Sequence, residues 1–415
     1  MDFRGVTHKV IEIPADKNTG LDAIFISYNT KEITEVIISG ISGTIIDVSK
    51  YSNLGGGFAQ SIPYTFSDGN IILPGVEGNL GYIISASDKN YYFWLVDYSS
   101  DPLNLDGVTL AEEQECENTK LIISGNGGDI HYYSISGQQL TLNRDVRLKY
   151  TTLEWDDEQK MYLPANEEKH LSSIAGTILL NPPFYCSTSV EITGDRFLKE
   201  WGIEQTIESS IFAPNAISVE SQAIETNISG EDASNIINSE TEGLGGSAPA
   251  DISFLGYVTD GVLHTEWQMA SDPEFEYILF RFNEQDISYS FEEEGRYYMR
   301  FIGSNADGSC EQFGETYTIT IGASDLRIPN AFSPNEDGIN DVWKVGYRSL
   351  IEFKCWIFDS KGTPMYEFDD PSGGWDGKYH GKVVRPGVYY YVIQATGADG
   401  KKYKKSGDIN ILNYK

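Results

Sequence analysis

The sequence has few basic residues, few cysteines and no long apolar run, and each scarcity excludes a class of protein. Its 30 Lys and Arg stand against 62 Asp and Glu, a formal net charge of −32. Such a surface repels nucleic-acid phosphates and anionic membranes. No apolar run approaches the length of a membrane span. Four cysteines in 415 residues are too few for a disulfide scaffold. We therefore expect no nucleic-acid partner and no membrane insertion.

Signatures of catalysis are also missing. The sequence has no Gly-x-Ser-x-Gly elbow, phosphate loop or dinucleotide fingerprint. Its five histidines are scattered outside any metal-binding spacing; they are His8, His131, His170, His264 and His380. Acidic clusters such as Glu154–Gln159 are interpreted as solvated turns, because glycoside hydrolysis needs two carboxylates across a cleft. We predict that the chain is not an enzyme, with no catalytic residue, metal site or other cofactor.

Short β-branched or aromatic runs, bounded by Gly, Asn, Asp or Pro, fill nearly the whole chain and predict β-strands. Tyr317, Ile319 and Ile321 alternate with threonines, and a second alternating set comprises Ile351, Phe353, Cys355 and Ile357. A helical turn or two is expected only at "DRFLKEWGIEQ". Strand clusters recur in blocks of roughly 75–110 residues, the size of a β-sandwich. We predict an all-β fold of tandem Ig-like β-sandwich domains in an elongated arrangement.

Composition suggests the domain boundaries. No Lys or Arg occurs between Lys199 and Arg281, and the polar stretch in between ends in Gly-Gly-Ser-Ala-Pro. Such a segment is typical of a linker or disordered loop. The predicted parts are a β-sandwich at 1–105, a second at 106–218, an acidic linker or disordered loop at 219–249, an Ig-like domain at 250–323 and a C-terminal domain at 324–415.

The last 90 residues differ from the rest in charge. From Leu326 to Lys415 there are 13 basic and 11 acidic residues, a balance of +2, whereas the preceding 325 residues hold 17 and 51, a balance of −34. A shift of this size indicates a separate domain.

This domain contains a series of motifs in order: Pro-Asn-Ala-Phe, Pro-Asn-x-Asp-Gly, Asn-Asp, Trp-Asp-Gly, Pro-Gly-Val-Tyr and a closing Gly-Asp. Their residues are Pro329, Asn330, Phe332, Pro334, Asn335, Asp337, Gly338, Asn340, Asp341, Trp375, Asp376, Gly377, Gly381, Pro386, Gly387, Tyr389, Gly407 and Asp408. The stretch resembles the gliding-motility-associated C-terminal domain of Bacteroidetes, the type B sorting domain of the type IX secretion system.

The resemblance implies export through the periplasm by the outer-membrane machinery of that system, and an extracellular or cell-surface location. A signal peptide is then expected upstream of Met1, because no basic segment followed by an apolar core begins the sequence.

From the residues themselves, the motifs predict the turns and core of a sandwich, with Trp375 closing one end of the core. The two-sided apolarity of Val388–Ile393 predicts a central strand, or one packed on a neighbouring domain. In Asn335–Asp341, oxygen side chains alternate around a glycine. An Asx turn is expected there; calcium is the alternative, although the spacing and closing Glu of an EF-hand are absent.

The preceding domain resembles the PKD-type Ig-like family through a core tryptophan and a Gly, aromatic strand, Asn-x-x-Gly pattern. The matching residues are Trp267, Gly295, Tyr297, Asn305 and Gly308. Such domains are usually spacers or interaction modules.

The cysteine prediction depends on the secretion resemblance, because the periplasm is oxidising. Cys116 and Cys186 fall near the first and last strands of the second domain, and we predict a disulfide between them. Cys310 and Cys355 are expected to remain thiols.

The sequence contains no motif that specifies the role outside the cell. The leading hypothesis is a non-catalytic adhesion or scaffold protein with a surface glycan or protein ligand. The alternative is a carbohydrate-binding accessory protein or hydrolase-associated module that uses exposed aromatics such as Tyr91, Tyr92 and Trp94.

Overall fold

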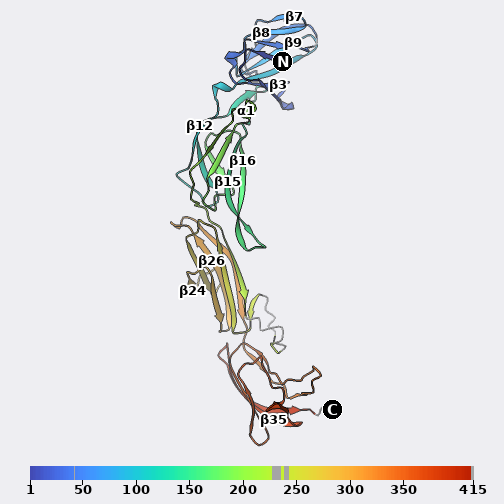
Figure 1. Ribbon diagram of the computed structural model, residues 1–415, viewed down its shortest axis with the longest axis vertical. Helices are drawn as coiled ribbons and strands as arrows, with labels where there is room; N and C mark the ends of the chain where they lie inside the picture. Colours follow the sequence, from blue (N-terminus) through green and yellow to red (C-terminus); the bar gives the residue numbers. More distant parts are fainter. Residues whose placement is uncertain (42, 227–234, 238–242, 413–415) are drawn as a thin grey trace. The chain divides into compact units, whose positions relative to one another are not determined.

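The computed structural model describes residues 1–415 except 42, 227–234, 238–242 and 413–415. The chain divides into two compact units, one formed by Met1–Asp157 and Tyr162–Ala216, the other by Glu158–Met161 and Ile217–Lys415. Strands dominate both units (Figure 1), so the predicted all-β fold is confirmed. No helix in the described part of the chain is both long and apolar enough to cross a membrane.

The first domain is a sandwich of two sheets, with strand orders β1-β4-β8-β7 and β2-β3-β10-β9-β5-β6. β3 and β10 are parallel, and the other pairs are antiparallel. The strands are β1 (Asp2–Arg4), β2 (Ile11–Pro14), β3 (Ala23–Ser27), β4 (Glu35–Ile38), β5 (Ile45–Tyr51), β6 (Gln60–Ser61), β7 (Thr65–Ser67), β8 (Asn70–Pro74), β9 (Leu80–Ala86) and β10 (Asn90–Asp97), with 3-10 turns η1 (Lys17–Thr19), η2 (Thr30–Glu32) and η3 (Tyr98–Ser100).

The second domain has a three-stranded sheet, β11-β12-β17, a four-stranded sheet, β16-β15-β18-β19, and a hairpin, β13-β14. Its elements are β11 (Asn104–Leu110), β12 (Thr119–Asn126), β13 (Ile130–Tyr133), β14 (Gln139–Leu142), β15 (Val146–Asp156), β16 (Met161–Leu171), β17 (Thr177–Leu180), β18 (Val190–Gly194), α1 (Arg196–Glu200) and β19 (Gln205–Glu208). The short helix α1 lies where the sequence predicted a helical turn.

These two domains share a core. Phe93 and Leu95 of β10 pack inside the first sandwich, whereas Trp94 and Val96 pack in the same cluster as Ile130 of the second domain. The Trp94 and Tyr133 rings are 5.7 Å apart. Because the β13-β14 hairpin covers this face, Trp94 is 1% exposed. Tyr91, Tyr92 and Trp94 were predicted to be exposed. The prediction is wrong for Trp94, and the two tyrosines are half-buried.

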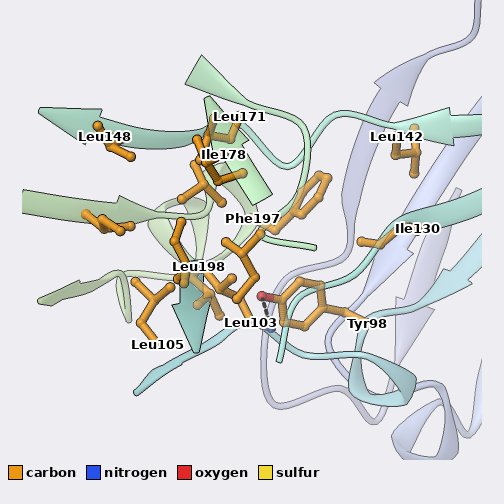
Figure 2. Packing of buried hydrophobic residues seen from close by; sticks show 14 of the residues in the cluster. Tyr98, Leu103, Leu105, Ile130, Leu142, Leu148, Leu171, Ile178, Phe197 and Leu198 are labelled. Atoms are coloured by element: carbon orange, nitrogen blue, oxygen red, sulfur yellow. Dashed lines mark hydrogen bonds between the residues drawn. The ribbon is translucent and has the colours of Figure 1, made fainter. Parts of the chain in front are cut away.

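A buried polar cluster lies within this core. The Arg144 guanidinium contacts the Asp195 carboxylate, with Nη1 and Oδ2 2.9 Å apart, and both side chains are 0% exposed. The Tyr98 hydroxyl donates to the same carboxylate oxygen and accepts the backbone N–H of Leu103. Figure 2 shows Tyr98 beside Leu103 and Phe197. Burial raises the pKa of the Tyr98 phenol well above its usual value, and the Asp195 charge adds to the effect.

The third domain pairs a three-stranded sheet, β20-β22-β25, with a five-stranded sheet, β21-β27-β26-β23-β24. Its strands are β20 (Val219–Glu225), β21 (Leu244–Gly246), β22 (Ala250–Val258), β23 (His264–Ala270), β24 (Ile278–Phe282), β25 (Ile287–Phe291), β26 (Gly295–Ser304) and β27 (Glu311–Ile321). Trp267 is 0% exposed and its ring lies 5.3 Å from Phe254, as expected for a core tryptophan.

The predicted linker at 219–249 is wrong at both ends. Residues 219–225 form β20, which pairs antiparallel with β22, and residues 244–246 form β21, which pairs with β27. A polar sequence forms β20 because an edge strand needs only one apolar face. Residues 227–234 and 238–242 of the predicted linker lie outside the described residues.

The fourth domain, orange to red in Figure 1, is built on the sheet β29-β36-β35-β31-β32, with the pairs β28-β30 and β33-β34 beside it. Its strands are β28 (Asp325–Arg327), β29 (Ala331–Phe332), β30 (Gly346–Arg348), β31 (Leu350–Phe358), β32 (Pro364–Phe368), β33 (Lys378–Tyr379), β34 (Lys382–Val383), β35 (Gly387–Gly397) and β36 (Lys402–Ile411). Phe353, Cys355 and Ile357 are buried as predicted, but Ile351 is 41% exposed, because a register shift between Leu350 and Glu352 moves it out of the alternation.

The predicted disulfide between Cys116 and Cys186 is also wrong. Cys186 carries a thiol, which contacts the backbone O of Thr151 at 3.8 Å. Its sulfur therefore faces β15 of the four-stranded sheet, whereas Cys116 lies in the connection between β11 and β12 of the other sheet. Cys116 and Cys310 are both disulfide-bonded, so Cys310 was wrongly expected as a thiol. Cys355 is a buried thiol, as predicted.

Candidate functional site

The predicted sorting motif lies entirely in the fourth domain, and the structure brings its separate stretches together. The loop between β29 and β30, the loop that holds Trp375, and strands β35 and β36 meet around one end of the core. Apolar motif residues fill this end, whereas polar and glycine residues build the turns around it.

Trp375 is the centre of an aromatic cluster. Its side chain is 0% exposed, and its ring lies 5.6 Å from that of Phe332 and 5.2 Å from that of Tyr389. The indole N–H donates to the backbone O of Lys378 at 3.1 Å, so its polar atom is satisfied inside the core. Trp375 closes the core, as the sequence predicted.

Trp343 is a structural partner of Trp375 that lies outside the predicted motif residues. It forms a reciprocal pair of backbone hydrogen bonds with Trp375, at 2.9 and 3.0 Å. Its side chain is also 0% exposed, and its indole N–H donates to the backbone O of Pro329 at 2.8 Å. An aromatic residue two positions after Asp341 was the only signal in the sequence.

Gly377 is required by two features of its position. Its φ is +72°, a conformation that favours glycine. A Cβ built there would lie 2.9 Å from Cγ of Pro334 and 3.3 Å from Cζ of Phe332. The turn of the Trp-Asp-Gly motif is thus packed directly against the Pro-Asn-Ala-Phe stretch.

The loop Asn335–Asp341 is held together by its own carboxylates. Asp341 accepts the backbone N–H groups of Asn335, Glu336 and Gly338, at 2.9, 2.6 and 2.7 Å. Partial desolvation opposes ionisation of Asp341, but these backbone donors together lower the pKa of its carboxyl below the usual value. The expected Asx-type turn is present, because Asp337 accepts the N–H of Ile339 two residues on at 2.8 Å.

The remaining motif residues also have structural roles. Asp376 accepts the N–H of Lys378 at 3.0 Å, and Asp408 accepts from the Asn410 amide at 2.8 Å. A Cβ at Gly407 would lie 2.6 Å from the Tyr391 hydroxyl. Pro386 directly precedes β35, Gly387 begins it, and Gly381 is at the turn between β33 and β34.

The histidines, which could serve in acid–base chemistry or metal binding, lie outside this aromatic cluster. Of the predicted scattered histidines, His170 contacts Asp145, with Nδ1 and Oδ1 2.6 Å apart, in the second domain. His380, in the fourth domain, makes an edge-to-face contact with the Tyr379 ring, with the ring centres 4.1 Å apart. The described residues include no group of three or more His, Cys, Asp or Glu placed to hold a metal ion. Calcium binding at Asn335–Asp341 stays the alternative to a plain turn, and both carboxylate oxygens of Asp341 already accept backbone N–H groups.

Several solved structures are similar to this chain at low identity. One is a tetra-tandem repeat from the extending region of a large adhesion protein, 12% identical, which covers 91% of this chain and 95% of that one at a TM-score of 0.22. Dimeric latent PorU from Porphyromonas gingivalis is 10% identical, covers 78% and 35%, and has a TM-score of 0.16. Sidekick-1 immunoglobulin domains 1–5 are 10% identical, cover 94% and 78%, and have a TM-score of 0.24. TM-scores this low support no conclusion about this chain.

No curated protein matches the chain. Two family models each match a single domain of it. The fibronectin type III domain family matches residues 108–209, which agrees with the Ig-like sandwich seen there. The CHU_C type IX secretion signal domain family matches residues 326–411, the stretch that holds the whole motif cluster. The PKD type of the third domain stays a prediction, although its Ig-like sandwich fits. The chain thus combines Ig-like domains, one of them of the fibronectin type III family, with a C-terminal domain that belongs to the type IX secretion signal family.

Proposed function

We propose that this chain is a passenger of the type IX secretion system, delivered to the cell surface or the medium by its signal domain, residues 326–411. The observation that carries the proposal is that the family motif closes a separate core. Trp375, Phe332 and Ile409 bury their side chains within the signal domain itself. A folded domain whose buried core residues all come from its own sequence, with Ile236 packed against them, suits recognition as an address.

Upstream of the signal domain, we propose a non-catalytic adhesion or scaffold role with a surface glycan or protein as ligand. Ig-like and fibronectin type III domains support this role, because their sandwich cores are filled by side chains and their outer strands and loops are left for contacts. The carbohydrate-binding alternative has lost its main support, since Trp94 is buried under the β13-β14 hairpin.

Export is tested by cutting the chain after Gly322, so that the signal domain is missing. Full-length and shortened chains are expressed behind the same signal peptide in a bacterium with the type IX system, and in its translocon-deficient derivative. Full-length protein should reach the surface or medium only when the translocon is present, and the shortened chain should stay periplasmic in a protease-resistant form. Export of the shortened chain, or of full-length protein without the translocon, contradicts the proposal.

The surface role is tested separately with purified full-length protein. We expect saturable binding to a glycan or protein on an array of surface ligands, and no hydrolysis of a panel of polysaccharides and peptides above background. Turnover that a single point substitution abolishes would contradict the non-catalytic role while leaving the export proposal intact.

A further inference from the structure

The outer face of the signal-domain sheet carries an apolar patch that the fold does not use. Tyr389, Tyr391 and Ile393 of β35 point toward the domain core, and Ile393 is 0% exposed. Val388, Tyr390 and Val392 lie on the opposite face and are 44%, 46% and 37% exposed. The predicted two-sided apolarity of β35 is therefore real. Its inner half is buried in the core, whereas its outer half is not.

Neighbouring strands extend the patch. In the antiparallel register of β31 and β35, Trp356 pairs with Val392 and Phe358 pairs with Tyr390, so that these side chains share the outer face. Both β31 residues are half-buried. We call Trp356, Phe358, Val388, Tyr390 and Val392 the outer patch. An antiparallel sheet that faces only water on one side normally places polar residues there. A cluster of five apolar side chains instead marks a contact surface.

Charged residues of both signs border the outer patch: Asp408 pairs with Tyr390 and Glu367 pairs with Trp356, whereas lysines gather at the other end. On the same face, Gln394 pairs with Lys354 on one side and Lys404 on the other, and Thr396 pairs with Lys402. These residues, together with Glu352, line a groove of about 260 Å³. Lys402 and Lys404 are exposed and form no ion pair with any described residue. In a chain with 62 acidic and 30 basic residues, two adjacent unpaired lysines are notable.

We infer that this face is the recognition surface of the signal domain, and that its partner is a protein of the export machinery with apolar side chains beside acidic ones. Interfaces of this kind have an apolar core and a charged rim that sets orientation and specificity. The outer patch provides the core, and Lys402 and Lys404 provide the basic part of the rim; Lys354 is paired with Glu367 at 3.6 Å. The inference rests on the proposed function, because it names the surface through which export is specified.

The charge of the rim also selects the partner. The acidic domains of this chain would repel an acidic receptor, but the lysine rim of the signal domain attracts one. Nucleic acid is disfavoured, because the chain as a whole carries a net charge of −32. An acidic protein surface is the chemistry that complements both the patch and its rim.

The chain provides a closely matched control for a test. The first variant is Tyr390→Thr with Val392→Thr, at residues 46% and 37% exposed. The control is Tyr366→Thr with Val383→Thr, at residues 40% and 41% exposed in β32 and β34, outside the patch. Both pairs replace the same residue types at similar exposure, and threonine keeps a high β-propensity.

A second variant tests the rim without changing the apolar surface. Lys402→Glu with Lys404→Glu reverses two exposed charges. Its control, Lys361→Glu with Lys382→Glu, makes the same change in net charge at two exposed lysines elsewhere in the domain. Neither pair contributes to the core, so the second variant reports on recognition even if the first loses stability.

All variants are made in the full-length chain, and surface and medium protein is quantified against the periplasmic pool. Loss of two interface residues should reduce export of the Tyr390/Val392 variant by about tenfold or more. The lysine reversal should reduce it by at least about threefold, since rim charges contribute less than the buried centre. Both controls should export within about twofold of the unchanged chain. Limited proteolysis of the purified variants verifies the fold.

The outcomes separate the two proposals. If unchanged protein needs the translocon but the folded patch and rim variants are exported normally, the recognition surface lies elsewhere and the inference is overturned, while the proposed function stands. If unchanged protein does not need the translocon, the proposed function itself fails. If sedimentation shows that the unchanged chain self-associates and the Tyr390/Val392 variant does not, the patch is a contact between copies, which also overturns the inference.

Discussion

Replacing Arg144 by methionine should strongly destabilise the first two domains. Arg144 donates from Nη1 to Asp195 at 2.9 Å and from Nε to the backbone O of Gly128 at 2.7 Å; its Nη2 donates to the backbone O of Asp101. Methionine fills much of the same volume but leaves the Asp195 carboxylate buried without its cation. Breaking a buried ion pair by removing one partner costs about 3–5 kcal/mol.

The structure favours the lower end of that range. Asp195 keeps three other donors, namely the Tyr98 hydroxyl and the backbone N–H groups of Phe197 and Leu198. We therefore expect a loss of about 3 kcal/mol. A unit of this size shifts its melting temperature by roughly 2–4 °C per kcal/mol, so the expected decrease is about 6–12 °C.

Differential scanning calorimetry of the full chain is the suitable assay, because a multidomain protein unfolds in several transitions. Arg4→Met is the control: Arg4 pairs with Glu35 at 3.0 Å, but the two side chains are 57% and 34% exposed. An exposed pair contributes about 0.2–1 kcal/mol, so its transition should move only slightly. Equal shifts for the two variants would refute the view that burial makes the Arg144 pair costly to break.

The double variant Arg144→Met with Asp195→Ser sharpens the test. Serine can still accept the helix N–H groups that Asp195 accepts, but it carries no charge. The double variant should therefore lose clearly less stability than the sum of the two single changes, because neither buried charge is left alone. Strict additivity would mean that the two side chains do not act as a pair.

Three further predictions concern the rest of the chain. Burial raises the pKa of the Cys355 thiol to about 12, so iodoacetamide at about pH 8 should label this thiol only after unfolding. Cys116 should stay unlabelled until a disulfide reductant is added, and peptide mass spectrometry distinguishes the two cysteines. Trp375→Ala should destabilise the signal domain by about 3–5 kcal/mol, and an unchanged C-terminal calorimetric transition would contradict its core role. Since the folded-state pKa of Asp341 is lowered, its ionisation stabilises the domain above the unfolded pKa of about 3.9. The stability gap to Asp341→Asn should thus shrink as the pH falls from the unfolded pKa through the lower folded-state pKa, and a pH-independent gap would refute this linkage.

Local patterns in the sequence were sufficient wherever local geometry decides the structure. The alternation of Tyr317, Ile319 and Ile321 predicted a strand with an inner face, and Ile319 and Ile321 are buried in it. Trp375 was predicted to close the C-terminal core and does so. The turn at Asp337 followed from side-chain oxygens spaced to accept nearby backbone N–H groups.

Features that depend on distant parts of the chain were not predictable in this way. Trp94 seemed available to solvent because nothing in its own strand reveals that β13 and β14 will cover it. Ile351 fits the inward alternation of its strand, but a bulge changes the register at that position. Cys116 and Cys186 belong to one domain, yet their sequence positions do not show that Cys116 lies in the β11–β12 connection while the Cys186 sulfur faces β15 of the other sheet.

In the signal domain, the sequence motif likewise does not reveal which surface is recognised. Its motif residues are those with demanding geometry: Gly377 needs a positive φ, Asp341 must accept three N–H groups, and Trp375 must fill the core. Substituting any of them damages the fold, so loss of export in such variants cannot separate folding from recognition. The outer patch has the opposite property. Other residues can replace Tyr390 and Val392 without loss of the strand, so these positions belong to no sequence motif. A recognition surface made of such residues can therefore be identified only when the structure shows which face of β35 the core leaves uncovered.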